Sequence, residues 1–334
     1  MTALAVTHPT LLDFTRELGA DGKIQTDIAE VLRQTNPILD YLPFVMANET
    51  TGHKSIIRSG LPTPTWRELY GGVQPTKGES IAVRDTIGML ESYCEVDKAL
   101  ADLGGNTVAF RRNQEVAHIQ GMSHEMASTF LYGNEETERA AFTGLAPRYL
   151  LSTGAINSTH VLKDTEDSAS TNSDFWVLGL GINKIFGTFP QSSKAGLSYT
   201  DFGEVTIGDA TNGYYQGYRS HFRWDMGLVV EDWQYGVRIH WGTTSAATFI
   251  SAGTGTPLSN MLIKALELLP SRDNCRPVIL SSRKGKEQLK LQIKKEMTYN
   301  LTRETIAGVP TDVFDGVPIL TTDAILNNLA ALTA

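Results

Sequence analysis

The stretch from residue 47 to residue 80 limits the fold of this chain most, because it has too few apolar side chains to build a core. Only five of its 34 residues are Leu, Ile, Val or Phe, whereas five are Gly and three are Pro. Segments below about 20% in these apolar residues do not bury enough surface to fold alone. After it, Ile81, Val83, Ile87 and Met89 follow the alternation typical of a strand. We therefore predict a long two-stranded arm that lies on another surface, either its own body or a second subunit.

Within this arm, Thr65 and Glu68 have the spacing of a helix-capping box. The spacing predicts the start of a short helix close to the tip of the arm. Trp66 lies beside it and has almost no apolar neighbours in the sequence.

The rest of the chain has the composition of a globular protein. Hydrophobic residues make up 41% of its 334 residues, which is sufficient for a core, and the length predicts about two domains. Acidic residues outnumber basic ones by 37 to 29, which disfavours a free-standing DNA-binding protein. Cys94 and Cys275 are far apart in the sequence, so we expect two free thiols. The sequence has no run of 18 apolar residues, so we expect no membrane span, and we also expect no secretory signal.

Apolar spacing predicts several regular elements. A helix is expected over 107–132, ending at Gly133, because apolar residues recur there every three or four positions. Two half-buried strands are expected over 214–241, and two short helices within the first 40 residues. After residue 255 the pattern predicts a helix from Leu262 to Leu269, a short strand over 277–280 and, towards the end of the chain, a further helix from Asp323 to Leu329. Between 289 and 297 both a strand and a helix fit.

The motifs that would indicate catalysis or metal binding are all incomplete. His124-Glu125 resembles half of a zinc-protease motif, but Ser128 stands where the second histidine belongs. The run from 179 to 184 has Lys184 in place of the third glycine of a dinucleotide loop, which indicates a strand-end turn. The run from 282 to 286 lacks the upstream glycine of a phosphate loop. We therefore expect no enzyme activity, no metal and no cofactor.

One segment carries a strong local charge. Between 276 and 304 there are eight basic and three acidic residues. The simpler interpretation is a solvated face, and the alternative is contact with an acidic partner, either DNA or another copy of the chain. The basic residues are Arg276, Arg283, Lys284, Lys286, Lys290, Lys294, Lys295 and Arg303.

The order of short motifs along most of the chain resembles the major capsid proteins of tailed bacteriophages, most of all those of the short-tailed Bordetella-phage type. No single motif is specific, but their joint order is. The resembling motifs are Leu12-Asp13, Asp21-Gly22-Lys23-Ile24, Gln34-Thr-Asn36-Pro-Ile-Leu39, Thr51-Gly-His53, Arg58-Ser-Gly60-Leu-Pro62, Trp66-Arg67, Gly72-Val-Gln-Pro75, Glu95-Val-Asp97-Lys98, Phe142-Thr-Gly-Leu-Ala-Pro-Arg148-Tyr149, Ser193-Lys-Ala-Gly196-Leu and Phe314-Asp-Gly316-Val-Pro318.

This resemblance implies an α+β chain with the Hong Kong ninety-seven phage capsid fold. Its expected parts are an N-terminal arm over 1–46, an extended arm called the E-loop over 47–88, a peripheral domain over 89–250 and an axial domain over 251–334. The helix 107–132 would be the spine helix of the peripheral domain. In the usual order of this fold the peripheral strands follow the axial domain. Here the strands at 214–241 precede it, so the resemblance also implies a circularly permuted order.

The resemblance further implies self-assembly through hexamers and pentamers into an icosahedral shell around double-stranded DNA. Scaffolding, portal and cement proteins are the other expected partners, no membrane is involved, and assembly would take place in the host bacterial cytoplasm. We expect contacts between subunits at Trp66, Arg67, Glu68 and Lys77 of the E-loop. Electrostatic contacts are expected at Arg283, Lys284, Lys286, Lys290 and Lys294 of the axial domain.

Two other classes of protein stay open from the sequence alone. A β-rich hydrolase would need a convergent pocket and would form a small closed oligomer. A tail or adaptor protein of a virion would form a ring with a fixed small number of subunits.

Overall fold

The computed structural model describes Pro9 and residues 36–103, 106–151, 156–164, 171–191, 193–208, 213–252, 257–296, 301–306 and 309–332. These residues form two compact units. Unit 1 contains residues 89–127 and 196–225, and unit 2 contains residues 36–88, 128–195 and 226–334. The short helices expected before residue 36 lie outside the described residues.

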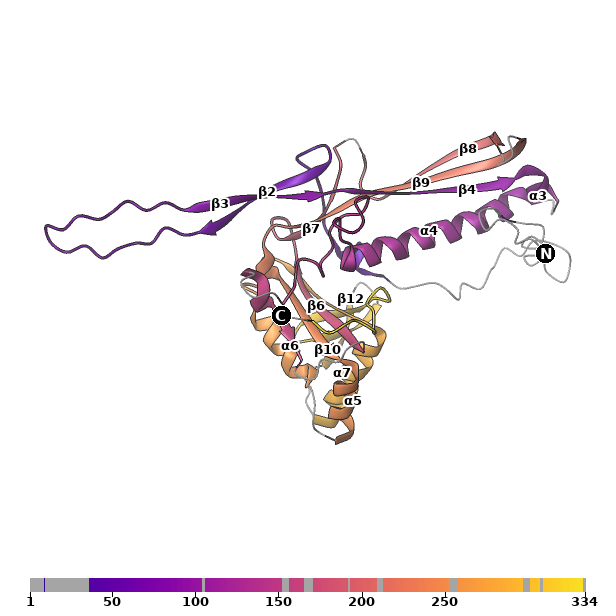
Figure 1. The fold of residues 1–334 in the computed structure, drawn as a ribbon. Helices are drawn as coiled ribbons and strands as arrows, with labels where there is room; N and C mark the ends of the chain where they lie inside the picture. Colours follow the sequence, from indigo (N-terminus) through magenta and orange to yellow (C-terminus); the bar gives the residue numbers. More distant parts are fainter. Residues whose placement is uncertain are drawn as a thin grey trace. The chain divides into compact units, whose positions relative to one another are not determined.

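Unit 1 is a long helix packed against a narrow antiparallel sheet (Figure 1). The helix α4 covers Thr107–Tyr132, which confirms the predicted bounds. The sheet is formed by β8 (Leu197–Gly208), β9 (Tyr214–Val230) and β4 (Gly88–Asp97), and α3 (Lys98–Asp102) follows β4. One apolar cluster holds these elements together. Its buried members are Cys94, Val96, Leu100, Ala101, Phe110, Met122 and Phe222.

Unit 2 is built on a mixed sheet whose central strands are buried on both faces. Every residue of β6 (Asn172–Leu180) and of β10 (Gly236–Gly242) is buried. The sheet continues from β6 on one side through β11, β14, β13 and β12, and on the other side through β7. These outer strands are β11 (Arg276–Ser281), β14 (Val317–Thr321), β13 (Val309–Phe314), β12 (Leu301–Ile306) and β7 (Ile185–Phe189).

Three helices pack on this sheet and complete the main core of unit 2 (Figure 1). They are α5 (Thr243–Ala252), α6 (Leu258–Glu267) and α7 (Arg283–Glu296). Phe175 and Trp241 from the sheet meet Leu262 of α6 and Leu289 of α7 in one buried cluster. The remaining short elements of unit 2 are α2 (Ile38–Tyr41), β1 (Phe44–Met46), β5 (Val161–Lys163) and the 3-10 turns Ile156–His160 and Trp233–Tyr235.

The predicted arm is a two-stranded ribbon of unit 2. Strand β2 (Gly52–Gly60) pairs with β3 (Glu79–Thr86) in antiparallel register, and these two strands form a sheet of their own. In Figure 1 the ribbon projects from the other strands of unit 2 and ends in the loop between Gly60 and Glu79. This arrangement confirms the two-stranded arm.

The two strands expected within residues 214–241 are present as β9 and β10, but they do not pair with each other. Strand β9 pairs with β8 and β7, whereas β10 pairs with β6 and β5. Strand β10 is also buried on both faces rather than on one. Aromatic alternation identified both strands correctly, but it contains no information about which strand lies beside which. The expectation of a circularly permuted order depended on the position of these strands before the axial domain, and it stays a prediction.

Two further expectations near the C-terminus are now decided. Residues 283–296 are helical, because Leu289 and Ile293 lie on the same side of a helix and are both buried, while Leu291 is exposed. The helix expected from Asp323 to Leu329 is wrong, since this segment forms turns and a single bridge from Leu329 to Asn172. Among the described residues, no helix is long and apolar enough to cross a membrane.

Candidate assembly surfaces

The tip of the arm exposes large apolar side chains to solvent. Trp66 is 99% exposed and Leu69 is 90% exposed, and Tyr70 beside them is fully exposed. Leu61 and Val73 on either side of this group are also exposed. Single exposed apolar residues are common on soluble proteins, but a contiguous group of large ones typically marks a site of contact with another molecule. The tip therefore has the chemistry of an interface that is not satisfied within its own chain.

The structure of the tip differs from the expected short helix. No helix follows Thr65, and a turn forms instead, in which the backbone N–H of Gly71 donates to the carbonyl of Glu68. Arg67 Nε also donates to the carbonyl of Gly71 at 2.9 Å. The two glycines at 71 and 72 disfavour a helix by about 1 kcal/mol each relative to alanine. The helix-capping spacing is therefore not followed by residues that can propagate a helix.

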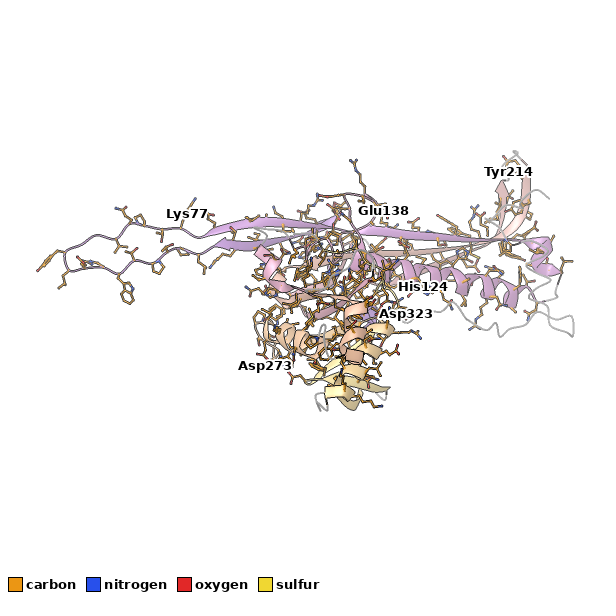
Figure 2. The ribbon with its side chains drawn as sticks, turned by 60° about the horizontal axis from the view of Figure 1, so that its bottom comes forward. Lys77, His124, Glu138, Tyr214, Asp273 and Asp323 are labelled. Atoms are coloured by element: carbon orange, nitrogen blue, oxygen red, sulfur yellow. The ribbon has the colours of Figure 1, made fainter. Side chains whose placement is uncertain are left out.

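The other arm residues that we predicted as contacts also face solvent. Glu68 and Lys77 are exposed, and Figure 2 labels Lys77 on the arm. Neither residue forms an ion pair with another described residue. All four predicted arm residues therefore lie in one loop, and they are available to a partner.

The basic residues of α7 are only partly available to a partner, because three of them pair with acids of their own chain. Two guanidinium nitrogens of Arg283, Nε and Nη2, donate to the two carboxylate oxygens of Asp323 at 2.6 and 2.7 Å. Lys286 and Lys290 share Asp312 of β13, at 2.8 and 2.6 Å. Like charges on this helix are thus offset within the protomer, by acids that lie 22 to 40 positions away in the chain.

Asp312 is the centre of this arrangement. Burial by itself would raise the pKa of this carboxyl, but the hydrogen bonds from Lys286 and Lys290 outweigh burial and hold its pKa below the usual value. The carboxylate is therefore ionised at neutral pH, and it fastens α7 to the neighbouring strand.

Two predicted basic residues of α7 differ from the others. Lys284 and Lys294 are exposed, and within the described residues neither has an ion-pair partner. The basic surface open to another molecule is consequently smaller than the sequence indicated. Of the predicted contact residues, it retains Lys284 near the start of α7 and Lys294 near its end.

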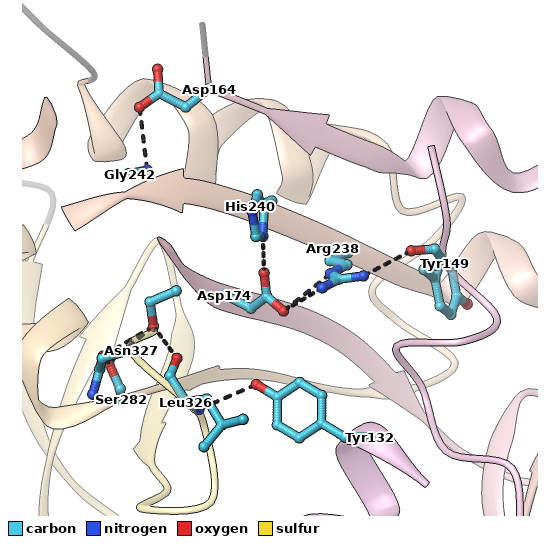
Figure 3. A network of polar contacts seen from close by, with 11 residues as sticks. Tyr132, Tyr149, Asp164, Asp174, Arg238, His240, Gly242, Ser282, Leu326 and Asn327 are labelled. Atoms are coloured by element: carbon cyan, nitrogen blue, oxygen red, sulfur yellow. Dashed lines mark hydrogen bonds and ion pairs between the residues drawn. The ribbon is translucent and has the colours of Figure 1, made fainter. Parts of the chain in front are cut away.

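A buried polar network in the core of unit 2 was not predicted (Figure 3). Asp174 of β6 binds Arg238 at 2.8 Å and the Nδ1 atom of His240 at 2.6 Å, and both partners are on β10. Arg238 also donates to the carbonyl of Tyr149 at 3.2 Å. The side chains of Asp174, Arg238 and His240 are between 0 and 5% exposed. A substrate has no access to a group so enclosed, so we assign the network a structural role.

The incomplete motifs have structural explanations. The 179–184 run is the turn between β6 and β7, as expected. In the 282–286 run, Ser282 caps α7, because its hydroxyl accepts the backbone N–H of Gly285 at 3.0 Å. His124 lies on α4 (Figure 2). Among the described residues, no group of three or more His, Cys, Asp or Glu side chains is arranged to hold a metal ion.

Comparisons with known proteins extend over almost the whole chain. The family model for major capsid protein GP7 matches residues 19–333. A chain from the solved structure of bacteriophage Epsilon15 is 30% identical over 100% of both chains, with a TM-score of 0.82. A chain of the bacteriophage JBD30 capsid is 11% identical, and the match covers 96% of this chain and 99% of that one with a TM-score of 0.49. No curated protein matches the chain.

Proposed function

The chain belongs to the major capsid protein GP7 family, and we propose that it forms hexamers and pentamers in which the arm of each subunit lies over a neighbour. Membership of this family establishes a structural role in a phage capsid rather than an enzymatic one. The match to the phage chain over its whole length also establishes the Hong Kong ninety-seven type of α+β fold. The capsid of the virion is therefore its location.

The observation that supports the arm contact is the contrast between the arm and the rest of the chain. The tip exposes Trp66, Leu69 and Tyr70, whereas the central strands of unit 2 are fully buried. Ordering a loop costs about 1 to 2 kcal/mol per residue in backbone entropy. Burial of the exposed apolar tip against a second subunit would offset that cost, with Trp66 as the central anchor and Arg67, Glu68 and Lys77 around it.

We assign the parts of the fold by the same resemblance. Residues 1–46 would be the N-terminal arm, 47–88 the E-loop, 89–250 the peripheral domain with α4 as its spine helix, and 251–334 the axial domain. The two compact units divide the chain at other points, since β10 and α5 belong to unit 2 together with α6 and α7. The proposed domains therefore describe position in a capsomer rather than separate folding.

We further propose that α7 contacts an acidic partner in the shell. Lys284 and Lys294 are the residues best suited to it, because the charges of Arg283, Lys286 and Lys290 already have partners in their own chain. The acidic partner is either a neighbouring subunit or packaged double-stranded DNA, bound without sequence reading. Scaffolding, portal and cement proteins, assembly in the host cytoplasm and the specific Bordetella-phage type belong to the same proposal.

Reversing the charge of both free lysines tests the role of α7. We expect Lys284→Glu with Lys294→Glu to lower shell yield or genome retention at low salt. The effect should shrink as salt rises, because about 0.15 M salt screens charges beyond roughly 8 Å. Shell yield and packaged DNA are measured over a series of salt concentrations. Lys264→Glu, an exposed lysine on α6, is the matched control, and equal behaviour of the two variants would make α7 an ordinary solvated face.

Assembly of the purified chain tests the proposed function as a whole. We expect analytical ultracentrifugation over micromolar concentrations to show capsomers or closed shells, and electron micrographs to show particles of uniform diameter. A single ring of fixed subunit number would support a tail or adaptor protein instead. A monomer at all concentrations, with the arm resistant to protease, would contradict the arm contact.

A further inference from the structure

The root of the arm, where β2 and β3 join the rest of unit 2, contains buried polar atoms that have no hydrogen-bond partner within the described part of the chain. The arm contributes His53 Nδ1, Ser55 Oγ and Asp85 Oδ2, and β7 contributes Thr188 Oγ1. Ser55, Asp85 and Thr188 are at most 5% exposed. Polar side-chain atoms buried in proteins nearly always have a partner, which is either protein or ordered water. Several unpartnered atoms in one region therefore indicate a bound polar ligand.

The three arm atoms belong to one face of the ribbon. His53 and Asp85 are directly opposite each other in the register of β2 and β3. Side chains opposite each other in such a pair have Cβ atoms about 5 Å apart. Ser55 lies two residues further along β2 and therefore on the same face. Asp85 is buried on this face, whereas the next residue, Arg84, is on the other face and is exposed.

Thr188 approaches the same region from the sheet. Thr188 and Phe186 are two residues apart on β7, so they share one face of that strand. The ring of Phe186 meets the ring of His53 edge-on, with their centroids 5.5 Å apart, so this face of β7 packs against β2. A side-chain carbon on Gly227 would lie 2.7 Å from the carbonyl oxygen of Thr86 and 2.9 Å from Thr188 Oγ1. The hydroxyl of Thr188 is therefore close to β3 as well.

Arg148 satisfies only one of the two carboxylate oxygens of Asp85. Its Nη1 atom donates to Asp85 Oδ1 at 2.6 Å. Its other nitrogens donate to three backbone carbonyls, those of Thr143, Gly144 and Leu228, at 3.0 to 3.2 Å. These three acceptors hold the guanidinium in place, and Oδ2 receives no donor from the described residues. Removing a carboxylate oxygen from water without a donor is costly, so this atom needs a donor from outside the chain.

We propose that the arm root is a buried water site, in which one or two ordered waters bridge Asp85, Ser55 and His53 to Thr188 of β7. The inference goes beyond the assembly role and does not depend on it, because every residue of the site belongs to one chain. The arm is then fastened to unit 2 by water as well as by the ion pair between Asp85 and Arg148.

Water suits the hydrogen-bonding roles of these atoms. The oxygen of an ionised Asp85 only accepts, the two hydroxyls both donate and accept, and an imidazole nitrogen does either according to its tautomer. A buried water commonly makes about three hydrogen bonds and therefore needs a mixed group of this kind. A metal cation fits less well, because the guanidinium of Arg148 already neutralises the same carboxylate.

Deleting the two hydroxyls tests the site, because a hydroxyl with a ligand and one without respond differently. We expect Ser55→Ala and Thr188→Val each to lower the folding equilibrium constant roughly fivefold, the scale of one hydrogen bond. The double variant should lower it by less than the product of the two, because both hydroxyls share the same water. Denaturant unfolding of the unassembled full-length chain measures all three, and Thr200→Val, at an exposed position of β8, is the matched control.

Two results of this series would overturn the proposal. If the single deletions leave the folding equilibrium unchanged or favour the folded state, the hydroxyls have no ligand, since only their desolvation cost is removed. If the effects of the two deletions simply multiply, the hydroxyls do not share a ligand and no water bridges the arm to β7.

A density map of the wild-type protein that resolves ordered water identifies the ligand directly. We expect a peak about 2.7 to 3.2 Å from Asp85 Oδ2 and from at least one of the two hydroxyls, which is hydrogen-bonding distance. A direct hydrogen bond between His53 Nδ1 and Asp85 Oδ2, with no peak between β3 and β7, would overturn the proposal, because the chain would then supply the missing donor. A peak with several oxygen ligands at about 2.0 to 2.6 Å would also overturn it, since such distances indicate a metal cation.

Discussion

Trp66→Ala is expected to lower shell yield strongly while the unfolding temperature of the protomer stays the same. The side chain is 99% exposed in its own chain, so its removal costs the isolated fold about 0.5 kcal/mol at most. At an interface, a buried tryptophan anchor costs about 2 kcal/mol or more when it is truncated. That is roughly a 30-fold loss in the affinity of each proposed arm contact, and in the proposed assembly every subunit contributes one arm.

The measurement is shell yield by sedimentation, together with the unfolding temperature of the unassembled chain. Tyr214→Ala is the matched control, because Tyr214 is an exposed aromatic residue on β9 of unit 1 (Figure 2). Normal shell yield for Trp66→Ala would remove Trp66 from the proposed interface. A lowered unfolding temperature would show instead that the tryptophan packs within its own subunit.

The parts of the fold that could be predicted from the sequence are those that depend on neighbours in the chain. Helix α4 was predicted with its bounds, because its apolar spacing is local and Gly133 ends it. The arm was predicted because the scarcity of apolar residues is a property of one continuous segment. In both cases the signal and the structure lie within the same 26 to 34 residues.

The parts that could not be predicted depend on partners distant in the sequence. Strand β8 has mostly exposed residues, so it gives no apolar alternation by which it can be recognised. Strand β6 begins with Asn172, Ser173 and Asp174, whose polarity indicates a loop, yet all three are buried. They are tolerated because distant residues satisfy them. Asp174 meets Arg238 across 64 positions of the chain, and no local pattern identifies that pair.

The same difference between local signals and distant partners applies to the candidate contact residues. The four arm residues are exposed in their own chain, because a segment without a core has no apolar surface against which to bury them, and their contact with a second subunit stays a prediction. The basic cluster was overestimated, since Asp312 and Asp323 neutralise part of it after the chain folds back on itself. A local excess of charge therefore gives an upper limit to the surface that is free to bind a partner.

Asp174→Ala is expected to destabilise unit 2 by about 3 to 5 kcal/mol, the effect of leaving a buried charge without its partner. Arg238 would keep only the carbonyl of Tyr149 among the contacts of Figure 3, and His240 would lose the acceptor of its Nδ1 atom. Whole domains are stable by about 5 to 15 kcal/mol, so the loss is a large fraction of the total. Denaturant unfolding, followed by the near-ultraviolet signal of the buried Trp176 and Trp241, measures it.

A second variant separates the ion pair from simple packing. Replacing both charges, in Asp174→Leu with Arg238→Met, removes the unpaired charge along with the pair, so the double variant should be more stable than Asp174→Ala. Glu267→Ala is the surface control, because the ion pair between Glu267 and Arg272 is exposed and should contribute less than about 1 kcal/mol. If Asp174→Ala unfolds at the same denaturant concentration as Glu267→Ala, the network does not stabilise the core, and water must reach Arg238 in solution.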